Sequence, residues 1–157
     1  MGGVDEEESA FMTMKGYLLV RSEGKSYGLP VARVLEVGDT TEVLAVPRRL
    51  PAVQGLTPLR GRLVPLIHLG AFLTGQAAPE TQGPGVRTIV LVEIKGRHVA
   101  LEVDDVDAVV REQPLPVPHG QALPWASAVA AQGPSAGGGQ GGLVPILDLD
   151  ALGDRIG

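Results

Sequence analysis

Cysteine and asparagine are both absent from this 157-residue sequence, and aromatic residues make up only 3% of it. The absence of cysteine excludes disulfides, thiolate catalysis and the commonest structural zinc sites. With one Trp, two Tyr and two Phe, the chain offers few stacking platforms for single-stranded nucleic acid. Val, Leu, Ile and Ala must therefore fill most of the core.

Clustered basic charge and long apolar runs are scarce as well. The formal net charge of −5 gives no general attraction to phosphate backbones or anionic lipid. No apolar run approaches the roughly 20 residues that cross a bilayer, and the N-terminal residues are acidic where a signal peptide would be basic. We therefore expect no nucleic-acid partner and no direct membrane insertion. The absence of cysteine fits a cytoplasmic protein, and we expect no cofactor and no small-molecule substrate.

The chain nevertheless has the composition of a folded protein, with 44% hydrophobic and 20% charged residues and a length that suits one domain. Residues 1–13 form an acidic segment that has too little apolar surface to fold, so we expect a disordered tail. The domain is expected over 14–157. Two Gly-, Pro- and Gln-rich stretches within it, 76–85 and 132–142, are predicted to be flexible loops.

Short Val-, Leu- and Ile-rich runs separated by Gly, Pro and Asp predict an all-β fold. Helical signals are short and are typical of connecting turns. The predicted turns are Val31–Glu36, Arg49–Val53, Leu69–Leu73 and Leu149–Leu152. The predicted strands are Tyr17–Val20, Ser26–Val31, Glu42–Val46, Leu56–Leu59, Leu63–Ile67, Arg87–Ile94, Arg97–Val103, Val106–Val110 and Leu143–Leu147.

An internal repeat reports a duplicated architecture. The pattern of 18–37 returns at 90–109, and the segment Leu63–Leu69 returns as Leu143–Leu149. Each half therefore starts with a hairpin and ends in a Leu-Val-Pro strand that runs into a short helix. We predict two similar small barrels, over about 14–75 and 86–152, that share a third apolar layer; whether they exchange strands is left open.

The segment Gly24-Lys25-Ser26-Tyr27-Gly28 matches the G-x-S-x-G motif of serine hydrolases, with Asp104 and His119 in the order of a triad. That motif requires a strand, a sharp turn and a long helix that follows. Here it lies between two predicted strands and is followed by Pro30, so we interpret it as a β-hairpin. A serine hydrolase that uses Ser26 is kept as an alternative function.

Other chemical motifs are weaker. The Gly137-x-Gly139-x-x-Gly142 pattern precedes a strand and opens no helix, so it lacks the helix N-terminus that a dinucleotide pyrophosphate needs. His68, His98 and His119 lie on separate elements, and Asp104, Asp105 and Asp107 lack the remaining ligands of a calcium loop. These residues predict no metal site.

The stretch Gly55–Leu69 is a more specific motif than those above, because two apolar strand segments flank Arg60-Gly61. It resembles the G-x-x-N-L-R-G-x-x-x-P-V-I-D-L signature of the CheW family, the adaptors that couple chemoreceptors to the histidine kinase CheA. Further matches are Val34-Leu35-Glu36-Val37 and Val103-Asp104-Asp105-Val106. Pro58 replaces the signature Asn and His68 replaces the signature Asp, which bears on partner choice.

The resemblance implies two five-stranded antiparallel SH3-like barrels with short connecting helices. It also implies a non-catalytic adaptor or scaffold, recruited to membrane-associated receptor arrays. The implied partners are the cytoplasmic tip of a methyl-accepting chemoreceptor and the regulatory domain of a CheA-type kinase. A small OB-like ligand-binding barrel is the other alternative.

The same resemblance implies which residues form the receptor and kinase interface. Arg60 matches the signature Arg, and Glu36 matches the acidic residue that faces it, so we predict an ion pair between them across the seam between the barrels. The remaining interface residues are Gly55, which permits a close backbone approach, and Val34, Ile89 and Val109, which are expected to line a groove. No catalytic residue is predicted.

Overall fold

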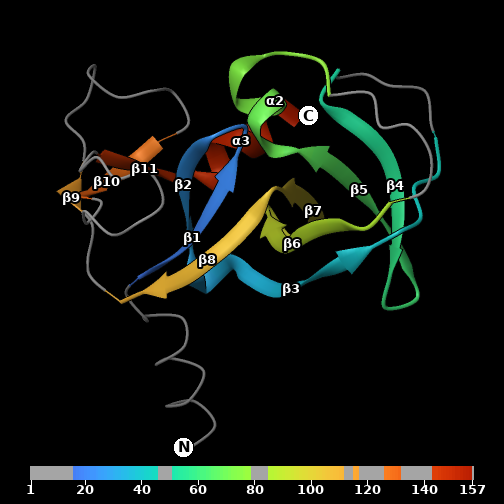
Figure 1. Ribbon diagram of the computed structural model, residues 1–157, viewed down its shortest axis with the longest axis horizontal. Helices are drawn as coiled ribbons and strands as arrows, with labels where there is room; N and C mark the ends of the chain where they lie inside the picture. Colours follow the sequence, from blue (N-terminus) through green and yellow to red (C-terminus); the bar gives the residue numbers. More distant parts are fainter. Residues whose placement is uncertain are drawn as a thin grey trace, which may run out of the picture.

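The computed structural model describes residues 16–45, 51–78, 85–111, 115–116, 126–131 and 143–156 (Figure 1). Most of these residues are in strands. The elements are β1 Tyr17–Ser22, β2 Lys25–Pro30, η1 Val31–Arg33, β3 Val34–Thr40, β4 Val53–Leu59, β5 Arg62–His68, α2 Leu69–Thr74, β6 Arg87–Ile94, β7 Arg97–Val103, β8 Asp105–Val110, β9 Leu115–Pro116, β10 Ala126–Ala131, β11 Leu143–Leu147 and α3 Leu149–Ile156. No helix in these ranges is long and apolar enough to cross a membrane.

The strands form a six-stranded sheet, ordered β8-β1-β2-β11-β10-β9, and a five-stranded sheet, ordered β3-β6-β7-β5-β4. The all-β prediction is confirmed, but the prediction of two five-stranded antiparallel barrels is wrong in detail. Each sheet contains one parallel pair, β2 with β11 and β5 with β7. Within the described ranges, neither sheet closes on itself, because the two ends of each strand order do not pair.

The two halves of the chain exchange strands. Hairpin β1–β2 comes from the first half, yet its neighbours β8, β11 and β10 come from the second; hairpin β6–β7 is flanked in the same way by β3, β5 and β4. The two parallel pairs are counterparts in the repeat. Gly28 lies opposite Ile146, and their repeat counterparts, Ala100 and Leu66, lie opposite each other in the same way. The question left open by the sequence is thus answered by the strand pairing.

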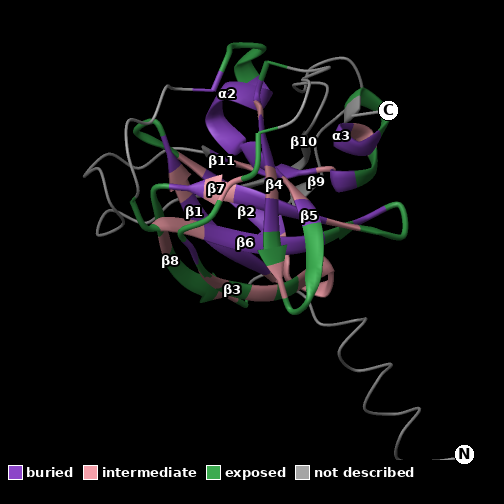
Figure 2. Ribbon diagram, turned by 90° about the vertical axis from the view of Figure 1, so that its right-hand side faces the viewer, coloured by how far each residue is buried: buried purple, intermediate pink, exposed green. Residues whose placement is uncertain are grey.

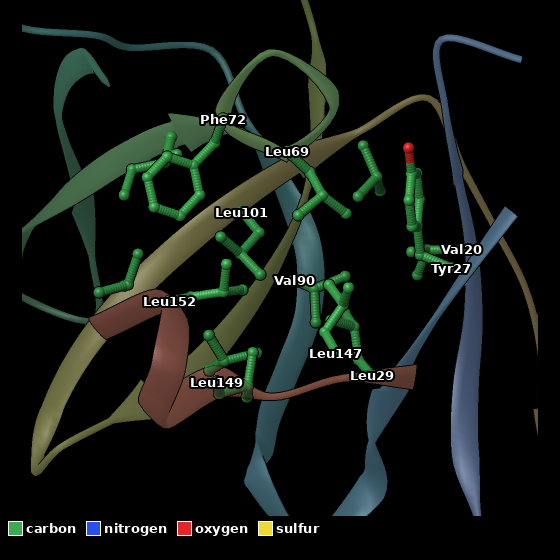
Figure 3. Close-up of a cluster of buried hydrophobic side chains, with 14 of the residues drawn as sticks. Val20, Tyr27, Leu29, Leu69, Phe72, Val90, Leu101, Leu147, Leu149 and Leu152 are labelled. Carbon is green, nitrogen blue, oxygen red and sulfur yellow. The ribbon is translucent and has the colours of Figure 1, made fainter. Parts of the chain in front are cut away.

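Three apolar layers hold the sheets together. Alternate residues of one strand enter different layers: Leu18 and Val20 belong to the layer between the sheets, whereas Tyr17 and Leu19 belong to a small core inside the six-stranded sheet. A matching small core inside the five-stranded sheet contains Leu91. The predicted third layer is therefore confirmed. Figure 3 shows part of it, with labelled side chains from both sheets, α2 and α3.

The tight turns follow from the sequence. Each hairpin within a half turns on a residue and a glycine that both have positive φ, the geometry that matches the right-handed twist of antiparallel strands. The first and third turns are repeat counterparts, and the second contains the signature arginine. The turns are Glu23-Gly24 (φ 53° and 78°), Arg60-Gly61 (51° and 77°) and Lys95-Gly96 (51° and 78°).

Several sequence predictions are corrected by the structure. The predicted helical turn Val31–Glu36 is a 3-10 turn only as far as Arg33, and strand β3 follows. The predicted strand Glu42–Val46 is represented by a single bridge between Leu44 and Leu56. Strand β10 had no counterpart in the prediction. The predicted tail 1–13 and most of the predicted loops 76–85 and 132–142 lie outside the described residues.

The two short helices begin with equivalent caps. His68 Nδ1 accepts a hydrogen bond of 3.1 Å from the backbone N–H of Ala71 at the start of α2. Asp148, the counterpart of His68 in the repeat, accepts one of 3.1 Å from Ala151 through Oδ1 at the start of α3. An N-cap needs only a side-chain acceptor at this position. The departure from the signature at His68 is therefore a replacement of one helix cap by another.

Candidate functional site

Glu36 and Arg60 are brought together although they belong to different elements that are well separated in the sequence. Glu36 lies on β3 and Arg60 in the β4–β5 turn, and Arg60 Nε is 2.7 Å from Glu36 Oε1. The predicted ion pair is confirmed, but Glu36 is on a strand and not at the end of a helical turn. The pair joins two parts of one five-stranded sheet and does not cross a seam between two barrels. The Arg60 side chain is 75% exposed and that of Glu36 is 30% exposed, so the pair lies at the surface.

The two charged groups of this pair differ in their exposure to solvent. Glu36 Oε1 is shielded from solvent and accepts no well-directed hydrogen bond, even though the guanidinium nitrogen is close. We therefore describe the contact as a close charge pair without an aligned hydrogen bond. An exposed pair of this kind contributes about 0–1 kcal/mol, whereas a fully buried one would cost roughly 3–5 kcal/mol to break. The observed exposure favours the smaller figure.

A pocket of about 310 Å³ opens beside this pair at one end of the five-stranded sheet. Its walls combine apolar and charged side chains from β3, β4, β5, β6 and β7. Toward the other end of the same inner face, Arg87 Nη1 lies 3.2 Å from Glu102 Oε1 and donates a 3.0 Å hydrogen bond to Gln54 Oε1. The pocket residues are Leu35, Glu36, Leu59, Arg60, Arg62, Val64, Leu91 and His98.

Val34 and Val109 lie on β3 and β8, which are edge strands of the two different sheets and lie toward the same end of the molecule in both views (Figures 1 and 2). Val34 packs against the layer between the sheets, and Val109 is 48% exposed. Val109 pairs with Leu18 across β8 and β1, which places both side chains on the face that looks toward this layer.

The repeat identifies two further residues that the sequence pattern was not used to assign to the interface. Val37 is the counterpart of Val109, is 45% exposed and pairs with Val90 on the same face. Val106 is the counterpart of Val34 and packs against the same layer. We call these four residues the valine strip: Val34, Val37, Val106 and Val109. The match between 18–37 and 90–109 was the signal that could have found the whole set.

Gly55 and Ile89 do not present side chains to a partner. Gly55 has φ 149°, and a Cβ there would lie 2.3 Å from the carbonyl oxygen of Leu44, so glycine permits the backbone bridge between Leu44 and Leu56. The close backbone approach expected at Gly55 is therefore made by Leu44 of the same chain. Ile89 is 1% exposed and lies in the small core of the five-stranded sheet, so the expectation that it lines a groove is replaced by a role in packing.

The arrangement around Ser26 is that of a hairpin. Ser26 pairs with Arg21 across β1 and β2, and β2 continues to Pro30 without a helix that would hold the hydroxyl in place. Asp104 accepts a 2.8 Å hydrogen bond from the backbone of Glu23. His119 and the 137–142 glycines lie outside the described residues. Within the described part of the chain, no three His, Asp or Glu side chains are grouped to hold a metal.

Pro58 occupies β4, which is the last strand of its sheet, and it is exposed. Proline is tolerated on an edge strand because its missing N–H need not enter a ladder. The strand therefore forms without the signature Asn, and what changes is the surface next to Arg60. Two polar groups that a partner could have bound, an amide side chain and a backbone donor, are replaced by a ring.

These features define a class of protein: a duplicated, strand-exchanged β module that carries an apolar strip on two edge strands and a charged pocket on one sheet. Comparison with models of protein families identifies the family to which the chain belongs. The CheW-like domain model matches residues 16–156, so the chain belongs to the CheW-like domain family.

Among solved structures, the chain is similar to the scaffolding protein TtCheW from Thermoanaerobacter tengcongensis, with a TM-score of 0.70 and 21% identity. The similarity covers 89% of this chain and 92% of that one, which shows a shared fold. The search of curated proteins found no match.

Proposed function

We propose that this protein is a non-catalytic adaptor that couples chemoreceptors to a CheA-type histidine kinase in a bacterial chemotaxis-type array. Membership of the CheW-like domain family supports the general role of a scaffold in such signalling. The observation that carries the finer proposal is the valine strip, an apolar surface that two repeat-related edge strands form together. The cytoplasmic location and the recruitment to receptor arrays are part of this proposal.

The valine strip is suited to a receptor tip, which in this family is a helical hairpin. A helical hairpin presents two similar antiparallel helices, and β3 and β8 are counterparts in the repeat, each at the edge of its sheet. Each edge strand offers one exposed valine, Val37 or Val109, to an apolar helix face. An apolar face docked in this way gains from burial and loses affinity when an unpaired charge must be desolvated.

The kinase is assigned to the end of the five-stranded sheet where Glu36 and Arg60 lie. Arg60 is largely exposed, so its guanidinium can bond a partner carboxylate with two donors. Gly55 holds the Leu44 segment against β4, and Ile89 packs beneath this surface; both support the interface without contacting the partner directly.

The experiment that tests the receptor surface is a pair of single substitutions, Val37→Asp and Val109→Asp, with Val86→Asp as the matched control. Val86 is 69% exposed and lies outside the valine strip. We expect both strip variants to lose binding to a soluble receptor fragment while kinase binding, measured by titration calorimetry, persists. Equal loss in the Val86→Asp control, or loss of both partners together, would contradict the assignment.

Serine hydrolysis at Ser26 remains the alternative from a different class. It predicts stoichiometric labelling of Ser26 by a fluorophosphonate probe, whereas the adaptor proposal predicts none, because a hydroxyl on a hairpin strand is not activated as a nucleophile unless a base is held beside it. An OB-like binding barrel would require a ligand that the acidic charge balance does not favour among nucleic acids.

A further inference from the structure

The charge at the rim of the pocket is opposite to that of the whole chain. Arg60, Arg62 and His98 line it, and Arg62 makes no ion pair within the described ranges. Among the residues that line the pocket, Glu36 is the acidic one and is paired with Arg60, whereas Glu93 lies opposite His98 in the β6–β7 pairing but does not line the pocket. The rim therefore has unneutralised positive charge above an apolar floor.

The apolar floor is made by side chains from three strands. Leu59, Val64 and Leu91 line the pocket and also belong to, or pack against, the small core of the five-stranded sheet. A segment that fills this pocket should therefore combine carboxylates for the rim with an apolar side chain for the floor. Burial of the apolar floor by this side chain would add a hydrophobic contribution to the binding free energy, beside the attraction between the charges.

The chain itself contains such a segment. Residues 5–8 are Asp5, Glu6, Glu7 and Glu8, the only run of four acidic residues in the sequence, and Phe11 and Met12 follow within four positions. This segment lies outside the described residues, and Gly16 is where the described chain begins. Its charge and apolar content are complementary to the rim and the floor.

The distance between Gly16 and the pocket is short enough for the segment to reach. The carbonyl of Gly16 accepts a 3.3 Å hydrogen bond from the N–H of Val31. Leu35, which lines the pocket, follows Val31 by four residues, and these span at most about 14 Å. The eight residues from Glu8 to Gly16 can span up to about 28 Å. The acidic run is therefore long enough to reach the pocket.

We propose that the acidic N-terminal segment of this chain binds back to the pocket, with its carboxylates at Arg60 and Arg62. Because the segment is tethered, its effective concentration is of the order of millimolar, so a weak contact suffices. The bound segment covers Arg60 and thereby restricts access to the Glu36–Arg60 end of the sheet. That regulatory consequence rests on the proposed kinase interface, whereas the binding itself does not.

The test uses the full chain and its lack of cysteine. Ser9→Cys introduces a single attachment site for a nitroxide, which broadens the NMR signals of nearby amides. We expect loss of intensity at the amides of 59–64 and 97–99, relative to α2 at the opposite end of the molecule (Figure 1). The loss should disappear in Arg62→Glu and in the triple variant Glu6→Gln, Glu7→Gln, Glu8→Gln. It should persist in the control Lys25→Glu, an exposed cation at the β1–β2 turn.

Salt provides a second readout, because about 1 M salt shortens the screening length to roughly 3 Å and should remove most of the broadening. Three results would overturn the proposal. These are no broadening at the pocket, broadening that Arg62→Glu leaves intact, and broadening that appears when spin-labelled chains are mixed with separate isotope-labelled chains, which would mean binding between copies. No partner protein is present, so failure here is distinct from failure of the adaptor proposal.

Discussion

The Glu36–Arg60 pair is expected to matter more for binding than for stability. Arg60→Ala removes the guanidinium but keeps a Cβ at a residue with φ 51°, so the conformational cost of the turn is little changed. Arg60 Nε is the charged group next to the buried Glu36 Oε1, but most of the Arg60 side chain is exposed. The free energy of unfolding should therefore fall by less than about 1 kcal/mol, the range of exposed pairs.

The assay is a double-mutant cycle of Arg60→Ala and Glu36→Ala, followed by urea unfolding and, in parallel, by affinity for the kinase regulatory domain. In unfolding, we expect a coupling free energy below about 1 kcal/mol, because the pair is exposed. In binding, each single variant should weaken the complex and the double variant should lose less than the sum. A loss of about 3 kcal/mol or more in unfolding for either single variant would refute the reasoning, since only a buried pair costs that much.

Three other predictions follow from the fold. His68→Ala should lower the free energy of unfolding by about 0.5–2 kcal/mol, a shift in Tm of a few degrees, whereas His68→Asp should retain the cap seen at Asp148; equal losses in calorimetry would contradict the capping role. The hydrogen bond from Arg33 lowers the pKa of the Asp150 carboxyl, so the stability that this pair contributes is present above the ordinary pKa of Asp and is lost as the pH falls through the folded value. The difference in stability between the wild type and Asp150→Asn should thus shrink in acid, and a difference that grows in acid would reverse the sign. Fragments 1–80 and 81–157 should each lack a fixed fold by circular dichroism and regain it when mixed, because each sheet takes strands from both halves; an independently folded fragment would argue against the exchange.

The middle strands of the sheets were the most predictable elements. The predicted bounds of β6 and β7 match the observed ones, because these strands are apolar on both faces and end at Lys95-Gly96 and Asp104. Strand β3 was missed because the segment after Pro30 was interpreted as a helical turn, and a register shift between Val34 and Glu36 interrupts the alternation of the strand.

The sheet topology could not be derived from local patterns. The repeat predicted the order of elements and the third apolar layer, but the parallel pairs, β2 with β11 and β5 with β7, join segments that are far apart in the sequence. Nothing in a single strand specifies such a partner. The same holds for the site: the ion pair was found through the family resemblance, while the burial of Ile89 and the charge on the pocket depend on how the strands pack.

Bridging of the two partners tests the central claim most directly. The purified protein is mixed with a soluble receptor fragment and a CheA-type kinase from the same cell, and the complexes are sized by light scattering while kinase autophosphorylation is recorded. We predict a three-component complex and receptor-dependent kinase activity that both require this protein, and that are lost with Val109→Asp but kept with Val86→Asp. Receptor-dependent kinase activity that is the same with and without this protein, and no complex containing it, would contradict the account.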